Sequence, residues 1–122
     1  MATIKILNSQ QIQELQKEFN NLFPFLKIEF FHHFHKDSQG SSKKDIIPVD
    51  YTLNQARKSK LEGVIEITPS MTVSQLEKSF QDKFGLSVQV FRKSGKSWLE
   101  TIVTDSWTLE HQNDQGKELS SL

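Results

Sequence analysis

Three histidines and an aspartate crowd the stretch FFHHFHKD, residues 30–37, and are the side chains best suited to metal or proton chemistry. In an extended strand, side chains two residues apart leave the same face, so His33 and His35 would point together and could chelate one ion. Neutral imidazoles suit zinc, copper or nickel, and Asp37 is the nearest carboxylate. The candidate metal ligands are therefore His33, His35 and Asp37. The alternatives are a pH-sensitive surface and a solvated strand end, and the polar residues that follow favour the strand end.

The other motifs with a chemical meaning point away from catalysis. SGKS, residues 94–97, has the letters of a phosphate loop, but that loop requires a glycine where Val90 stands and a helix where a strand is expected. A hairpin turn is the better interpretation. The chain has no cysteine, which excludes disulfides, thiolate metal sites and thiol nucleophiles. It also lacks the GxSxG motif of serine hydrolases. We therefore expect a non-enzymatic protein without a cofactor.

Length and charge limit the remaining possibilities. A chain of 122 residues is long enough for one domain with a core and too short for two, so residues 1–122 are expected to form a single domain. The 15 basic residues balance 15 acidic ones, which gives no general attraction for nucleic acid or anionic membranes. The basic residues between 57 and 60 are expected to be a solvated surface. No apolar run approaches the ~18 residues of a membrane span, so the sequence predicts a cytoplasmic protein with no membrane partner.

Periodic apolar residues predict two strand–helix–strand units. An amphipathic helix should end at Pro24, and a second should begin at the capping box of Thr72 and close at Gly85. A thin apolar stripe allows a short helix at 52–60. The polar stretch 36–45 is expected to be a mobile loop and residues 114–122 a tail. Alternating runs predict strands at 3–7, 26–33, 63–67, 86–92 and 97–104.

An internal match links the two units. Residues of the first unit match residues of the second with an offset of 61, which becomes 60 after Pro24. The matched pairs include Ile4 with Ile65 and Phe19 with Phe80. One interpretation is an internal duplication, with units at about 3–33 and 63–92. The other is that any two strand–helix–strand units share the same apolar spacing.

The order of elements predicts an α+β fold. Two right-handed strand–helix–strand units, each with room for one strand between its own two, interleave into a four-stranded antiparallel sheet with both helices on one face. This resembles the ferredoxin-like βαββαβ fold, with strand order 4-1-3-2. An added C-terminal hairpin strand, joined by a turn at Ser94 and Gly95, would lie beside the fourth strand and place Phe91 opposite Trp98.

The sheet face that no helix covers decides which partners to expect. RNA-binding domains of this fold stack bases on aromatic side chains of the two central strands, but here those strands carry Lys5, Leu7, Val64 and Glu66. Nucleic acid is therefore disfavoured. The aromatic residues lie on the outer strands, and the predicted interaction surface consists of Phe31, Phe91, Trp98 and Ile102. Its partner would be an unknown protein or a second copy in a homodimer, unless the segment around Trp107 covers it.

Protein interaction or self-association is thus the function that the sequence favours. A small-molecule or metal-sensing domain is the alternative, and it would use the strand-to-helix turns LNSQ, residues 7–10, and TPSM, residues 68–71. Helix N-termini at such turns offer backbone amides to an anion. An enzyme with a site that the motifs do not reveal is a further, less favoured class.

The block FGLSVQVFRKSGKSWLETIVTDSWTLEHQN, residues 84–113, resembles a segment of small uncharacterised bacterial proteins that belong to no named family of known function. The resemblance covers roughly a quarter of the chain and contains no catalytic signature. It implies a bacterial origin and says nothing about activity.

Overall fold

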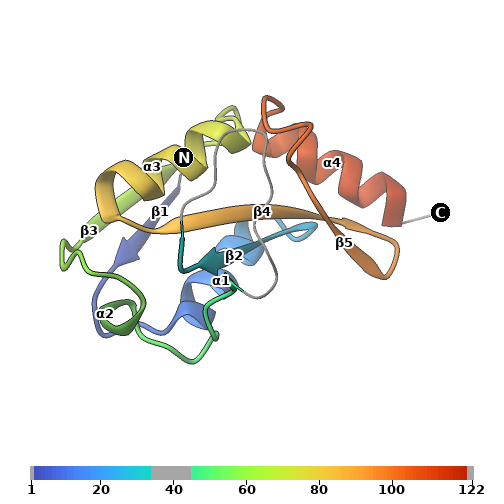
Figure 1. Ribbon diagram of the computed structural model, residues 1–122. Helices are drawn as coiled ribbons and strands as arrows, with labels where there is room; N and C mark the ends of the chain where they lie inside the picture. The colour runs from blue at the N-terminus through green and yellow to red at the C-terminus, as the bar shows by residue number, and fades with distance from the viewer. Residues whose placement is uncertain (1, 34–44, 121–122) are drawn as a thin grey trace.

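The structure is a computed structural model that describes residues 2–33 and 45–120 (Figure 1). Most of the loop expected at 36–45 lies outside the described residues. The strand–helix–strand units are present as β1–α1–β2 and β3–α3–β4. The elements follow in the order β1 (Ala2–Ile6), α1 (Ile12–Leu22), β2 (Leu26–Phe31), α2 (Leu53–Ala56), β3 (Gly63–Ile67), α3 (Val73–Phe84), β4 (Ser87–Ser94), β5 (Ser97–Glu100) and α4 (Leu109–Ser120).

Helix α3 begins and ends at the residues that the sequence predicts. The backbone N–H of Gln75 donates to Oγ1 of Thr72 at 3.1 Å, and the N–H of Thr72 donates to Oε1 of Gln75 at 2.9 Å, which completes the capping box. Gly85 ends the helix with φ of 63°, a left-handed conformation that glycine adopts without steric cost. The helix buries Phe80, as α1 buries Phe19.

The strands form two antiparallel sheets rather than one. In the first, β1 pairs with β3 and Ile4 lies opposite Ile65. In the second, β2 pairs with β4, Glu29 lies opposite Gln89, and β4 pairs further with β5. The predicted α+β class is confirmed. The strand order 4-1-3-2 of the ferredoxin-like fold is wrong, because that order requires β2 to pair with β3 and β4 to pair with β1.

Side chains of α1 and α3 form hydrogen bonds with the edges of β2 and β4. The side-chain amide of Gln16 in α1 donates to the carbonyl of Ile28 in β2 at 2.9 Å. In α3, Glu77 accepts from the N–H of Val90 in β4 at 3.1 Å. A further strand at either of these positions would have to displace these bonds.

One hydrophobic core joins both sheets to α1 and α3. The rings of Phe30 and Phe80 meet edge to face within it, with centroids 6.0 Å apart. Alternate residues of β1, β2, β3 and β4 point into this core, as the period of an extended chain requires. The strand residues in it include Ile4, Ile6, Ile65 and Ile67 of the first sheet and Leu26, Ile28, Phe30, Val88 and Val90 of the second.

The β4–β5 hairpin turns one residue later than predicted. Its turn residues are Gly95, with φ of 60°, and Lys96, because Ser94 lies opposite Ser97. A glycine with positive φ suits the first central position of a tight hairpin turn. Trp98 therefore lies opposite Lys93 rather than Phe91. The register differs from the predicted one by two residues, so each side chain keeps its predicted face.

Residues 109–120 form helix α4, where a polar tail was expected from residue 114. Its first turn is capped by Thr108, whose Oγ1 accepts from the N–H of His111 at 3.1 Å. Polar contacts hold it to the domain. The side-chain amide of the fully buried Gln112 donates to the carbonyl of Thr104 at 2.8 Å and accepts from Arg92 at 3.0 Å. A search for apolar periodicity misses such a helix because much of its buried face is polar.

The likeness of the two halves extends to α2 and α4. Both helices begin at a leucine that follows an aromatic residue and a threonine, in Tyr51-Thr52-Leu53 and Trp107-Thr108-Leu109. Each helix is held to the preceding long helix by the same two backbone hydrogen bonds. These bonds are Ile12 N–H to Tyr51 O and Leu53 N–H to Gln10 O in the first half, and Val73 N–H to Trp107 O and Leu109 N–H to Met71 O in the second.

Candidate functional site

The histidine stretch follows β2, and only its first part lies in the described residues. Nδ1 of His33 lies 2.7 Å from Oδ1 of Asp45, and the N–H of His33 donates to Oδ2 at 3.0 Å. This ion pair anchors the chain that returns along β2. His35 and Asp37 lie outside the described residues. Within residues 2–33 and 45–120, no three His, Cys, Asp or Glu side chains are grouped to hold a metal ion, so the metal site stays a prediction.

The contact with His33 changes the pKa of the Asp45 carboxyl group. Burial acts to raise the pKa of its carboxyl group, but the hydrogen bonds and positive charge of His33, with a smaller effect from His32, outweigh burial. The pKa of Asp45 therefore lies below its ordinary value of 3.8. Asp45 is therefore ionised at neutral pH.

Two of the predicted interaction residues, Phe91 and Trp98, share one face of the β4–β5 hairpin and are both half-buried. The ammonium group of Lys27 lies 5.4 Å from the ring centre of Phe91 and 5.2 Å from that of Trp98. Lys93 lies 5.9 Å from the ring centre of Trp98. These are cation–π contacts, so the lysine side chains cover the aromatic pair while their charged ends reach water.

The other predicted residues of this surface have different roles. Phe31 is only 3% exposed, so it contributes to the wall of the surface. Ile102 is half-buried and lies beyond the end of β5. The Trp107 ring lies 5.6 Å from the guanidinium carbon of Arg92, whose side chain leaves β4 on the face opposite that of Lys93. Trp107 thus lies on the face away from Trp98, and it is Lys27 that covers the aromatic pair.

Strand β5 is an edge of its sheet. Among the described strands it pairs with β4 alone. Ser97, Leu99 and Glu100 are exposed, as is Lys96 in the turn before them. A strand in this position presents unpaired backbone N–H and C=O groups to another chain.

The strand-to-helix turns of the sensing alternative are occupied by the chain itself. At the start of α1, the N–H of Ile12 donates to the carbonyl of Tyr51 at 2.9 Å. At the start of α3, the N–H of Val73 donates to the carbonyl of Trp107 at 3.1 Å. These amides already donate to carbonyl groups of the chain and are not available to an anion, and the ligand sites that the sequence suggested at the two turns stay a prediction.

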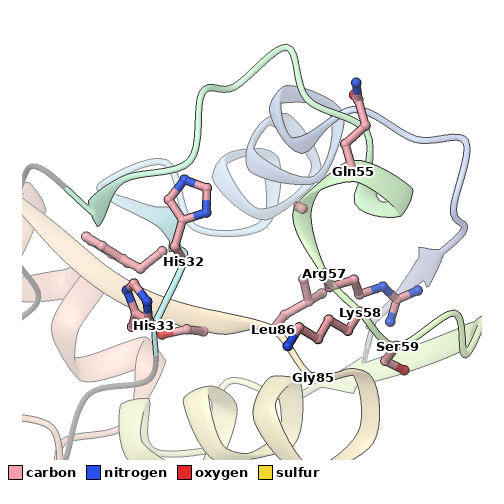
Figure 2. Close-up of a pocket in the computed structure, with 11 residues that line it drawn as sticks. His32, His33, Gln55, Arg57, Lys58, Ser59, Gly85 and Leu86 are labelled. Carbon is pink, nitrogen blue, oxygen red and sulfur yellow. The ribbon is translucent and has the colours of Figure 1, made fainter.

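A hollow of about 740 Å³ opens elsewhere, between the end of β2, the connection from α2 to β3, and the turn from α3 to β4 (Figure 2). We call it the basic hollow and define it by residues 31–33, 55–59 and 85–87. Four of these eleven residues are basic or can become so, and none is acidic. The basic or titratable lining residues are His32, His33, Arg57 and Lys58.

Arg57 is 7% exposed, although the sequence suggested a solvated surface for this stretch. Its guanidinium joins three segments of the chain. Nη1 donates to the carbonyl of Phe84 at 2.7 Å, while Nη2 donates to Oδ1 of Asn8 at 2.9 Å and to the carbonyl of Leu61 at 2.6 Å. Burial lowers the pKa of Arg57, and the nearby carboxylate of Glu62 acts in the opposite direction.

Nε of Arg57 and Oγ of Ser87 are buried polar atoms of the lining. Neither has a hydrogen-bond partner among the described residues. Figure 2 shows the Lys58 side chain extending toward Leu86 and the side of the hollow formed by His33, whereas the Arg57 guanidinium points the other way, toward β1. Lys58 is exposed and free to move its ammonium group. The arrangement can therefore hold an anion, with Lys58 as the direct contact.

No helix among the described residues is both long and apolar enough to cross a membrane. Comparison of the chain with models of protein families, with curated proteins and with solved structures finds no match.

Proposed function

We propose that the protein is a non-enzymatic self-association module, in which β5 of one copy pairs antiparallel with β5 of a second copy. The three-stranded sheet β2–β4–β5 would then continue across a twofold axis into the same sheet of the partner. Addition of a strand to an exposed sheet edge is a common mode of protein recognition, and a symmetric pair closes the edge of both copies at once.

The hairpin turn determines which backbone groups of β5 point outward. Ser94 and Ser97 flank the two-residue turn, so they exchange hydrogen bonds with each other. Because the pattern alternates along an antiparallel pair, the N–H and C=O groups of Trp98 and Glu100 point away from β4. These two residues supply the outward hydrogen bonds for a second copy of the strand.

The charge pattern around Trp98 is the observation that carries this proposal. Lys96 stands two residues before Trp98, and Glu100 stands two residues after it. An antiparallel pair centred on Trp98 therefore brings the turn of each copy, which carries Lys96, to the end of the other β5, where Glu100 lies. Opposite charges across neighbouring strands stabilise their pairing, and the two Trp98 rings would lie side by side on one face. A segment that is complementary to itself favours a second copy over an unrelated partner.

A charge exchange tests the pairing. Lys96→Glu places two acidic groups opposite each other at both ends of the pair, and Glu100→Lys places two basic groups there, so each single variant should be monomeric in sedimentation equilibrium. The double variant K96E/E100K restores opposite charges and should dimerise like the unchanged protein. All four residues involved in the two ion pairs are exposed, so the fold should tolerate these changes.

Trp98→Ser provides the second measurement. It should leave the circular dichroism spectrum unchanged and shift the protein toward monomer, because large aromatic residues dominate the energetics of interfaces. A monomer at every concentration for the unchanged protein would overturn the proposal, as would a double variant that stays monomeric. If W98S unfolds, Trp98 belongs to the core and the interface centred on it is lost.

We also infer that the chain is an internal duplication. The matched hydrogen bonds that hold α2 and α4 support this, because shared apolar spacing alone would not repeat a backbone contact between distant segments. Expression of residues 1–61 and 62–122 as separate chains tests it. Two halves that each retain a strand–helix–strand unit and reassemble on mixing are expected, and a half that assembles with itself would be still stronger support.

A further inference from the structure

We infer that the basic hollow binds a small organic phosphate, at a site separate from the β5 edge. The inference does not depend on self-association, since the hollow is lined by residues 31–33, 55–59 and 85–87, none of which belongs to β5.

Comparison of the two halves explains why a hollow exists at this place. In the second half, Gly116 of α4 packs so closely that an added Cβ would lie 2.9 Å from Cβ of Phe25 and 3.2 Å from Cγ of Arg92. With the offset of 60, Phe25 corresponds to Gly85 and Arg92 corresponds to His32, and both counterparts line the hollow. Helix α2 has only 4 residues, whereas α4 has 12. The basic hollow therefore lies where a longer α2 would pack.

The charge of the lining selects an anion. The three described partners of the Arg57 guanidinium are neutral oxygens, so no carboxylate in direct contact cancels its charge. Two carboxylates lie nearby. Glu62, which is outside the lining, acts on the Arg57 guanidinium, and Asp45 contacts His33. Lys58 adds an exposed ammonium group at the hollow itself. In a partly buried site these charges act more strongly than they would on an open surface.

The size and shape of the hollow indicate an organic body as well as a charged group. A volume of about 740 Å³ lies in the range of sites for small organic ligands and far exceeds the space that one inorganic phosphate fills. Phe31, Ala56 and Leu86 supply apolar walls. Lys58 supplies the direct contact for a phosphate, whose several oxygens can accept from its ammonium group, whereas Nε of Arg57 and Oγ of Ser87 are unpartnered polar atoms buried in the wall.

Phenyl phosphate is a suitable probe because it joins a phosphate to a small apolar ring. In a titration followed by amide NMR, we expect saturable shifts of residues 55–59 and 85–87. Lys58→Gln should raise the dissociation constant at least about fivefold, because a charge-assisted contact is lost. Lys78→Gln is the matched control, since Lys78 is an exposed lysine of α3 outside the lining, and it should bind like the unchanged protein.

The inference is overturned if no saturable shift occurs at ~10 mM phenyl phosphate, a concentration that fills most of a millimolar site. It is also overturned if K58Q and K78Q bind equally well. Phenol tests whether the charged group is needed. If phenol binds as tightly as phenyl phosphate, the hollow does not recognise a phosphate. Inorganic phosphate tests whether the ring is needed. If inorganic phosphate binds as tightly as phenyl phosphate, the hollow does not recognise an organic group.

Discussion

Ile4 of β1 lies directly opposite Ile65 of β3, and each is the residue that the offset of 61 assigns to the other. In the second sheet, Glu29 lies opposite Gln89, its own counterpart with the offset of 60. Because both pairs join a residue to its counterpart, an approximate twofold axis runs through the centres of both sheets. Each half contributes one strand to each of these central pairs, so neither half can complete a sheet alone.

This relation predicts equal contributions from Phe19 and Phe80. Both rings are 0% exposed and occupy corresponding places on α1 and α3. Phe19→Ala and Phe80→Ala should each lower the free energy of unfolding by about 3–5 kcal/mol, because each leaves a cavity in the shared core. Urea denaturation measures both values. A loss below about 1 kcal/mol for either variant would contradict the shared core.

The close packing of Gly116 predicts the sign of a second substitution. On an isolated helix, Gly116→Ala would be stabilising by about 1 kcal/mol, because alanine has the higher helix propensity. Here the new Cβ would meet Cβ of Phe25 at 2.9 Å and its carbonyl oxygen at 3.0 Å. We expect G116A to lower the melting temperature. The control is Glu118→Ala at an exposed position of the same helix, which should change it little, and a stabilised G116A would show that α4 is not docked here.

Local pattern was enough to predict α1 and α3, and the predicted strand order included the pairing of β1 with β3. The apolar stripe through Phe80, the capping box at Thr72 and the closing Gly85 are each encoded by a few neighbouring residues. The pairing of β2 with β4 is not encoded locally. It depends on bonds such as that from Gln16 to Ile28, and an amide on a helix surface carries no sign in the sequence that it will cap a strand edge.

The candidate sites were harder to predict from the sequence than the fold was. Phe91 and Trp98 could be assigned to one sheet face because alternation along a strand sets it. Arg57 could not be recognised, because its burial depends on the carbonyl of Phe84 and the side chain of Asn8, which are distant in sequence. The start of α4 has a signal in the sequence. The aromatic–threonine–leucine triplet at Tyr51–Leu53 occurs again at Trp107–Leu109, and this repeat predicts a helix that begins at Leu109.

The ion pair of Asp45 predicts a pH dependence of stability. Because the folded-state pKa of Asp45 is lowered, its ionised form stabilises the fold above the ordinary value of 3.8, and this contribution is lost as the pH falls through the folded-state pKa. Asp45→Asn should therefore reduce the melting temperature near neutral pH, and the difference from the unchanged protein should shrink as the pH falls below 3.8 and through the folded-state pKa of Asp45. Asp50→Asn, at an exposed aspartate, is the control. Identical pH profiles for the two variants would exclude a role for the His33 contact.

Arg57 has a structural role that a lysine cannot replace. Its guanidinium reaches the carbonyl of Phe84 from one nitrogen and Asn8 and Leu61 from the other. A lysine keeps the positive charge but has a single nitrogen at the end of its chain, so it cannot bridge acceptors on separate segments. Arg57→Lys should lower the free energy of unfolding by about 2–3 kcal/mol, because buried acceptors lose their donors.

Lys58→Arg separates this bridging role from the charge of the basic hollow. Lys58 is exposed, so K58R should keep the free energy of unfolding within about 0.5 kcal/mol of the unchanged protein. It also keeps a cation at the hollow and should still bind phenyl phosphate. Urea denaturation of R57K and K58R in parallel therefore compares two exchanges that both preserve charge. If R57K is as stable as K58R, the three bonds of Arg57 do not hold the α2–β3 connection, and the wall that it gives the hollow must be fixed by other contacts.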